Sequence, residues 1–84
     1  MTKNTGAEMA RRSYQAAITS ALTEARQAQG ISQRRLAELS GVSQPAIARI
    51  ESGSTTMRID TLLKVLAALG LTLAIVPLPT ADDQ

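Results

Sequence analysis

The stretch that decides the fold is SQRRLAELSGVSQPAIARIESG, residues 32–53. Ser32 and Ser43 each precede a short helical pattern, and their hydroxyl groups can cap the free amides at a helix start. Gly41 lies between the two patterns and permits the sharp chain reversal that a short connection requires. Helices joined this tightly cross steeply, and the small side chain of Ala37 lets them pack closely. The stretch therefore predicts two short, steeply crossed helices.

The helical spacing of apolar residues extends in both directions from this stretch. Upstream, the pattern predicts a helix over residues 13–29, which Gly30 ends. Downstream, it predicts a helix that begins near Ile59 or Asp60 and stops at Gly70. The faces expected to be buried consist of Tyr14, Ile18, Ala21, Leu22 and Ala25 in the first helix, and of Ile59, Leu62, Leu63, Leu66 and Leu69 in the second.

The chain of 84 residues fits one small domain that is mostly α-helical. Its first residues are polar and show no periodicity, which predicts a flexible arm. The aliphatic, partly β-branched stretch after Gly70 is typical of a strand. The predicted organisation is a flexible N-terminal arm over residues 1–12, a helical domain over 13–70 with its motif at about 33–52, a strand over 71–78 and a disordered tail over 79–84.

The composition argues against several classes of function. The chain has no Cys and no His, which removes disulfide bonds, thiolate chemistry, the commonest metal ligand and the commonest general base. It has no phosphate-binding loop and no nucleophile beside a base, so we expect neither an enzyme nor a cofactor. The apolar stretch from Leu62 to Leu78 contains Lys64 and falls short of the about 20 residues that span a membrane. No signal peptide is visible, so a cytoplasmic protein is expected.

Charge is distributed unevenly along the chain. The net charge is +2, but residues 11–58 carry seven arginines and three glutamates, hence 7 − 3 = +4. The C-terminal tail carries Asp82 and Asp83. A basic body favours a polyanionic partner, although a solvated charged surface is the simpler alternative on this observation alone.

Many spaced residues between about 20 and 70 agree with one known family. The matching residues are Leu22, Arg26, Gly30, Ser32, Gln33, Leu36, Ala37, Gly41, Val42, Gln44, Ile47, Ile50, Glu51, Gly53, Thr61, Leu62, Lys64, Leu66 and Leu69. In these residues the chain resembles the lambda Cro/C1-type helix-turn-helix family, also called the XRE family. The resemblance implies a lambda-repressor-like domain of four to five helices that binds double-stranded DNA. A helical bundle that meets this spacing by chance is the alternative.

The resemblance also implies how DNA would be bound. The helix at about residues 44–52 is expected to enter the major groove, where Gln44 can pair with adenine and Arg49 with guanine. Pro45 and Ala46 can contact a thymine methyl group. Phosphates are expected at the start of the preceding helix and at the loop after residue 52. The residues predicted to contact DNA are Gln33, Arg34, Ser43, Gln44, Pro45, Ala46, Ala48, Arg49, Ser52, Ser54, Thr55, Thr56 and Arg58.

The resemblance also implies that some residues near this predicted interface support the recognition helix or lie beside a phosphate. Gln33 is implied to contact a phosphate and to brace Gln44. Arg26 and Glu51 match a pair that forms a partly buried salt bridge in the family and sets the angle of the recognition helix. Arg34 lies near the expected phosphate, with plain surface charge as the alternative explanation.

The end of the chain carries a second resemblance. Residues 68–79, ALGLTLAIVPLP, look like the C-terminus of HipB-type antitoxins, in which a strand pairs with its copy in a second subunit. A lone strand in a helical chain leaves backbone groups unpaired, which independently favours pairing across a two-fold axis. Packing of this segment on the chain's own helices is the alternative. The residues predicted to face the dimer interface are Leu71, Leu73 and Ile75.

The predicted function is sequence-specific DNA binding by a homodimeric transcriptional repressor on a palindromic operator. The HipB-type resemblance implies the antitoxin of a toxin–antitoxin operon that the protein would autoregulate, with the cognate toxin as a second partner. A stand-alone phage-type or host repressor without a toxin is the alternative. Either protein would be bacterial or phage-derived and associated with the nucleoid.

Overall fold

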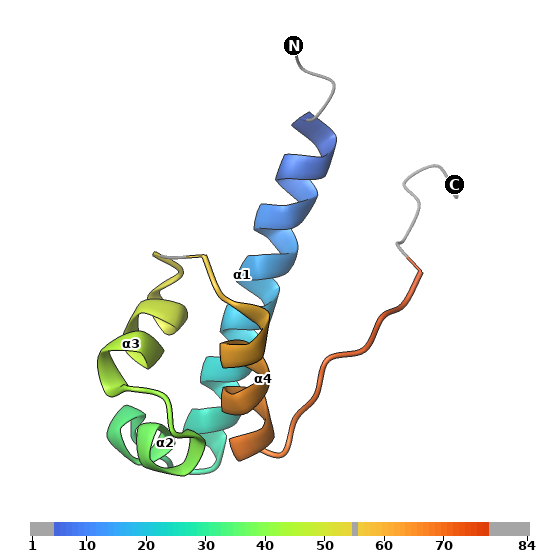
Figure 1. The fold of residues 1–84 in the computed structure, drawn as a ribbon. Helices are drawn as coiled ribbons and strands as arrows, with labels where there is room; N and C mark the ends of the chain where they lie inside the picture. Colours follow the sequence, from blue (N-terminus) through green and yellow to red (C-terminus); the bar gives the residue numbers. More distant parts are fainter. Residues whose placement is uncertain (1–4, 55, 78–84) are drawn as a thin grey trace.

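The computed structural model describes residues 5–54 and 56–77, which form four α-helices and no strand. The helices are α1 (Thr5–Ala28), α2 (Gln33–Ser40), α3 (Gln44–Ser52) and α4 (Ile59–Ala68) (Figure 1). The last three gather around the C-terminal half of α1, whose N-terminal half extends beyond them. The predicted mostly α fold class is confirmed. No helix in these ranges combines the length and the hydrophobicity that crossing a bilayer requires.

Serine and glycine residues set the limits of α2 and α3. The Ser32 hydroxyl oxygen accepts a hydrogen bond from the Arg35 amide at 3.0 Å and so caps α2. Gly41 and Gly53 follow the two helices with φ angles of 76° and 73°. Only glycine adopts this left-handed conformation without strain, so each helix ends where the sequence has a glycine.

A small aliphatic core joins the helices. Leu22 of α1, Leu36 of α2 and Ile47 of α3 are each fully buried. α2 contacts both α3 and α4, and α1 contacts α3. Ala37 is half-buried against the core. The buried residues are Leu22, Leu36, Val42, Ile47, Ile50, Leu62, Val65, Leu66 and Leu69.

Two helices bury fewer apolar side chains than their patterns predict. Ile59 and Leu63, expected in the buried face of α4, are 67% and 43% exposed. Val65, absent from the predicted face, is fully buried. The predictions for Ile59 and Leu63 are wrong because spacing indicates which residues share a face, but not whether another element covers that face. Tyr14 is 46% exposed for the same reason, since α2, α3 and α4 lie around the C-terminal half of α1 (Figure 1).

The first helix is longer than its pattern predicts. α1 begins at Thr5 instead of near residue 13, so residues 5–12 of the expected arm are helical, and residues 1–4 lie outside the described ranges. The Glu8 carboxylate accepts hydrogen bonds from Arg11 and Arg12, three and four positions along the helix. Contacts at this spacing stabilise a polar helical turn that hydrophobic periodicity does not reveal.

An extended segment follows α4. The Leu71 amide donates to the Leu66 carbonyl at 2.8 Å, and no main-chain group of residues 72–77 makes a backbone–backbone hydrogen bond to another residue that the structure describes. Every residue from 71 to 77 is exposed. The strand predicted over residues 71–78 would form only by pairing with a second chain, and the structure describes a single chain. The strand therefore stays a prediction. Its last residue, Leu78, and the predicted tail over 79–84 lie outside the described residues.

Candidate nucleic-acid interface

One side of α3 is exposed and carries polar side chains. Gln44 and Arg49 are exposed there, together with Pro45 in the first turn. Pro45 costs α3 no hydrogen bond, because the amides of a first turn have no acceptor within the helix. Ala46 and Ala48 are half-buried, and Ala46 packs against the core. The exposed side of α3 thus offers one amide and one guanidinium group to a ligand.

Ser43 sits at the point where α3 begins. Its hydroxyl oxygen accepts a hydrogen bond from the Ala46 amide at 3.2 Å. A hydroxyl that accepts in this way still has its own proton to donate. Since Ser43 is exposed, it can cap α3 and donate to a bound group at the same time.

A continuous chain of hydrogen bonds ties Gln44 to the interior of the molecule. Gln44 Nε2 donates to Gln33 Oε1 at 3.1 Å, and Gln33 Nε2 donates to Glu51 Oε1 at 2.9 Å. Glu51 also accepts from Arg26, whose Nε lies 2.6 Å from Oε2 and whose Nη2 lies 2.9 Å from Oε1. The four side chains come from α1, α2 and α3, so the network links three helices.

The ion pair at the inner end of this network is shielded from water. The side chains of Arg26 and Glu51 are 12% and 6% exposed. The hydrogen bond from Arg26 to Glu51 raises the pKa of the Arg26 guanidinium above its ordinary value. Arg26 Nη1 donates in addition to the Ile31 carbonyl at 2.7 Å. Because each charge is the partner of the other, the ion pair connects α1 to α3 away from water.

The start of α2 lies beside the exposed side of α3, since Gln33 contacts Gln44. Arg34, in the first turn of α2, is exposed. The amides of a helix start carry partial positive charge, which Arg34 reinforces. This end of α2 therefore suits an anion such as a phosphate group.

The loop after α3 keeps its hydroxyl groups close to the helix end. Ser52 Oγ donates to the Arg49 carbonyl at 2.9 Å and lies 2.9 Å from Ser54 Oγ. Gly53 makes the turn between the two serines. Both serines are exposed, so their hydroxyl groups face solvent next to α3.

The rest of this loop leads to α4. Thr56 and Arg58 are exposed, whereas Thr55 lies outside the described residues. Arg58 Nε donates to Asp60 Oδ1 at 3.2 Å, and this hydrogen bond holds the pKa of the Asp60 carboxyl below its ordinary value. Asp60 therefore stays ionised and offsets part of the charge that Arg58 presents.

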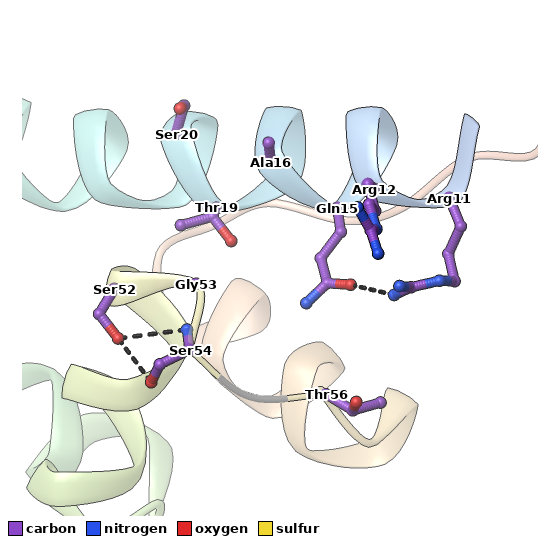
Figure 2. Close-up of a pocket in the computed structure, with 10 residues that line it drawn as sticks. All are labelled: Arg11, Arg12, Gln15, Ala16, Thr19, Ser20, Ser52, Gly53, Ser54 and Thr56. Carbon is purple, nitrogen blue, oxygen red and sulfur yellow. Dashed lines mark hydrogen bonds between the residues drawn. The ribbon is translucent and has the colours of Figure 1, made fainter. Parts of the chain in front are cut away.

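A hollow that was not among the predicted sites lies between α1 and the loop after α3 (Figure 2). Its volume is about 420 Å³. Arg12, Gln15 and Thr19 point from α1 toward the loop. The sequence offered a weak signal for this site, the adjacent arginines at 11 and 12, but no pattern that predicts a helix there. The residues with basic or hydroxyl groups that line the hollow include Arg11, Arg12, Thr19, Ser52 and Ser54.

A second surface, formed by α1, α4 and the segment 71–77, is apolar. Leu73 lines two adjoining hollows together with Tyr14 and Ile18. Ile59 lines one of them and Ile75 the other. We call these five residues the apolar surface. Of the residues predicted to face a dimer, Leu71 is 38%, Leu73 36% and Ile75 103% exposed.

Comparisons with known proteins agree with this geometry. A family model described as helix-turn-helix matches residues 22–76. An HTH-type transcriptional regulator of Haemophilus influenzae is 58% identical over 62 residues, which are 74% of this chain and 63% of that protein. The HTH-type transcriptional regulator PuuR of Escherichia coli is 51% identical over 53 residues, 63% of this chain and 29% of PuuR. The chain thus spans less than two thirds of the length of either relative.

A solved structure is also similar over most of the chain. It is described as a toxin–antitoxin module from Streptococcus pneumoniae, and its matching chain is 55% identical in sequence. The match covers 93% of this chain and 83% of that chain, with a TM-score of 0.67.

Proposed function

The chain belongs to the XRE-type helix-turn-helix family, and on that premise we propose that it binds a specific double-stranded DNA operator and represses transcription. The observation that carries this proposal is the network from Gln44 through Gln33 and Glu51 to Arg26. It connects the exposed side of α3 to two other helices through hydrogen bonds. A recognition element held in this way loses little conformational freedom when it binds.

The chemistry of α3 suits base edges in the major groove. Gln44 uses one N–H of its amide on Gln33, which leaves its other N–H and its carbonyl oxygen for the paired donor and acceptor of adenine. Arg49 is exposed and can donate two hydrogen bonds to guanine. Phosphates would bind at the start of α2 near Arg34 and along the loop from Ser52 to Arg58.

We propose further that two copies bind a palindromic operator together. A single recognition helix reads only a few base pairs, and a symmetric dimer doubles the site. The apolar surface supports this arrangement, and so does the backbone of residues 72–77, which makes no backbone–backbone hydrogen bond to any other described residue. Two copies of the segment would pair as antiparallel strands, with Leu71, Leu73 and Ile75 toward the helices.

The partner beyond DNA is proposed to be a toxin. The support is the chain of a toxin–antitoxin module that is 55% identical and covers 93% of this chain. In this proposal the protein is an antitoxin that represses its own operon at the bacterial nucleoid, without a cofactor and without catalysis. The two similar HTH-type transcriptional regulators favour a second candidate, a stand-alone repressor with no toxin.

Selection of duplexes from a random pool by the purified protein tests the DNA-binding function. The expected result is one enriched sequence with two-fold symmetry, bound by two chains. Enrichment of no sequence would disprove specific DNA binding.

Purification of the tagged chain, expressed from its native operon, distinguishes the antitoxin from the stand-alone repressor. The antitoxin proposal expects a stoichiometric second protein encoded beside it. A protein that purifies alone and still represses its own promoter would favour the stand-alone repressor.

A further inference from the structure

The hollow between α1 and the loop after α3 brings cations and hydroxyl groups together (Figure 2). We call it the basic hollow. Arg11 and Arg12 line it on α1, and Ser52 and Ser54 line it on the loop. Thr19 Oγ1 donates to the Ile50 carbonyl at 3.3 Å, which ties this part of α1 to the end of α3. The two walls of the basic hollow are therefore connected.

One carboxylate offsets part of the positive charge. Glu8 accepts hydrogen bonds from Arg11 Nε at 3.1 Å and Arg12 Nε at 3.3 Å. Hydrogen bonding to Arg11 is the largest cause that lowers the Glu8 pKa to about 2, so this carboxylate is ionised at neutral pH. The two arginines and this glutamate together carry a net charge of +1. The Arg12 side chain is 74% exposed and projects toward the loop.

The basic hollow adjoins the exposed side of α3. Thr56 lines it and also lines a neighbouring hollow that contains Arg49 and Arg58. A duplex in contact with Arg49 therefore lies next to the loop that forms one wall. Guanidinium and hydroxyl groups are the donors that bind the phosphate oxygens of DNA.

We propose that the basic hollow binds a backbone phosphate of the operator, through Arg11, Arg12 and the loop hydroxyl groups. This inference rests on the proposed DNA-binding function and deepens it, because the N-terminal half of α1 joins the DNA-binding surface. A phosphate contact carries no sequence information. The hollow therefore increases affinity for every duplex and increases the salt dependence of binding.

The first test is Arg12→Gln, which removes one charge from an exposed side chain. We expect binding about tenfold weaker on both the selected operator and a random duplex, and a slope of log affinity against log salt that is smaller by about 1. Arg12→Lys keeps the charge and should recover most of the slope. The matched control is Lys64→Gln, which removes the same charge from α4 outside the hollow and should bind like the parent.

The second test changes the charge in the opposite direction. Glu8→Gln removes the carboxylate that competes with phosphate for both arginines. We expect tighter binding to both duplexes and a steeper salt slope. Glu24→Gln makes the same change on α1 outside the hollow and should have little effect. Circular dichroism of each variant checks that α1 stays helical.

The outcomes separate the two proposals. If the parent protein enriches no duplex, the proposed DNA-binding function fails. If the parent binds but Arg12→Gln matches Lys64→Gln in affinity and slope, only the phosphate site is overturned. A loss confined to the operator, with the random duplex unaffected, also overturns the phosphate site because it indicates a base contact.

Discussion

Residues 33–52 and residues 71–77 both carry aliphatic side chains, but the first region buries several of them whereas the second leaves them exposed to water. Within α2 and α3, Leu36 and Ile47 are fully buried against the other helices. In the extended segment, Ile75 is fully exposed. The chain buries the core of the first region by itself, whereas every residue of the second region is exposed.

The difference separates two levels of assembly. A change at a buried residue of the helix-turn-helix acts on the folding of each chain, since the contacts of such a residue are internal. A change in the segment 71–77 acts on association, if the proposed dimer forms there. Four substitutions test this division.

Ile75→Asp should have the largest effect. The residue is fully exposed in the single chain, so a charge there leaves the monomer folded. In the proposed dimer the same charge would be buried without a partner, which is severely unfavourable. We expect a folded monomer with operator affinity lower by roughly a thousandfold, measured by sedimentation and titration. Ala74→Asp is the control, because Ala74 lies between Leu73 and Ile75 and would be on the opposite side of the strand. An Ile75→Asp variant that stays dimeric would place the interface elsewhere.

Glu51→Ala should destabilise the fold itself. Arg26 would keep its charge in a site that is 12% exposed and would lose its carboxylate partner. We expect a free energy of unfolding lower by about 3 kcal/mol, measured in urea at constant protein concentration. Glu38→Ala breaks the exposed ion pair with Arg35 and should cost less than about 1 kcal/mol. Equal unfolding midpoints for the two variants would contradict the structural role of Glu51.

Arg49→Ala should affect DNA binding and leave folding intact, because the side chain is exposed. We expect operator binding weaker by about 2 kcal/mol and relaxed preference at one base pair in each half-site. Titration of the operator and of a random duplex measures both effects. An equal loss on the two duplexes would show that Arg49 contacts phosphate instead of a base.

Ser43→Ala should have the smallest effect of the four. It removes the hydroxyl that accepts from the Ala46 amide at the start of α3. The loss of such a cap costs about 1 kcal/mol of stability. Thermal unfolding measures it, with Ser13→Ala on the exposed part of α1 as the control. A melting temperature equal to that of the control would mean that α3 does not depend on this cap.

The sequence located the helix-turn-helix well because its limits depend on local chemistry. Ser32, Gly41 and Gly53 act through their own backbone neighbours, so their roles can be inferred from the sequence. The exposure of Ile59 could not be inferred, because burial depends on which other element lies above it. The basic hollow depends on distant parts of the chain and on a polar helical turn around Glu8, neither of which hydrophobic spacing reports.

The network behind α3 also has a polarity. A carboxylate accepts hydrogen bonds and donates none, so Glu51 obliges Gln33 to direct its N–H group inward and its carbonyl oxygen outward. That oxygen in turn obliges Gln44 to donate. The orientation of the exposed Gln44 amide is thus decided by the shielded charge of Glu51, which lies two hydrogen bonds away along the network. Of the two ways in which a glutamine amide can be turned, the molecule presents a single one to its partner.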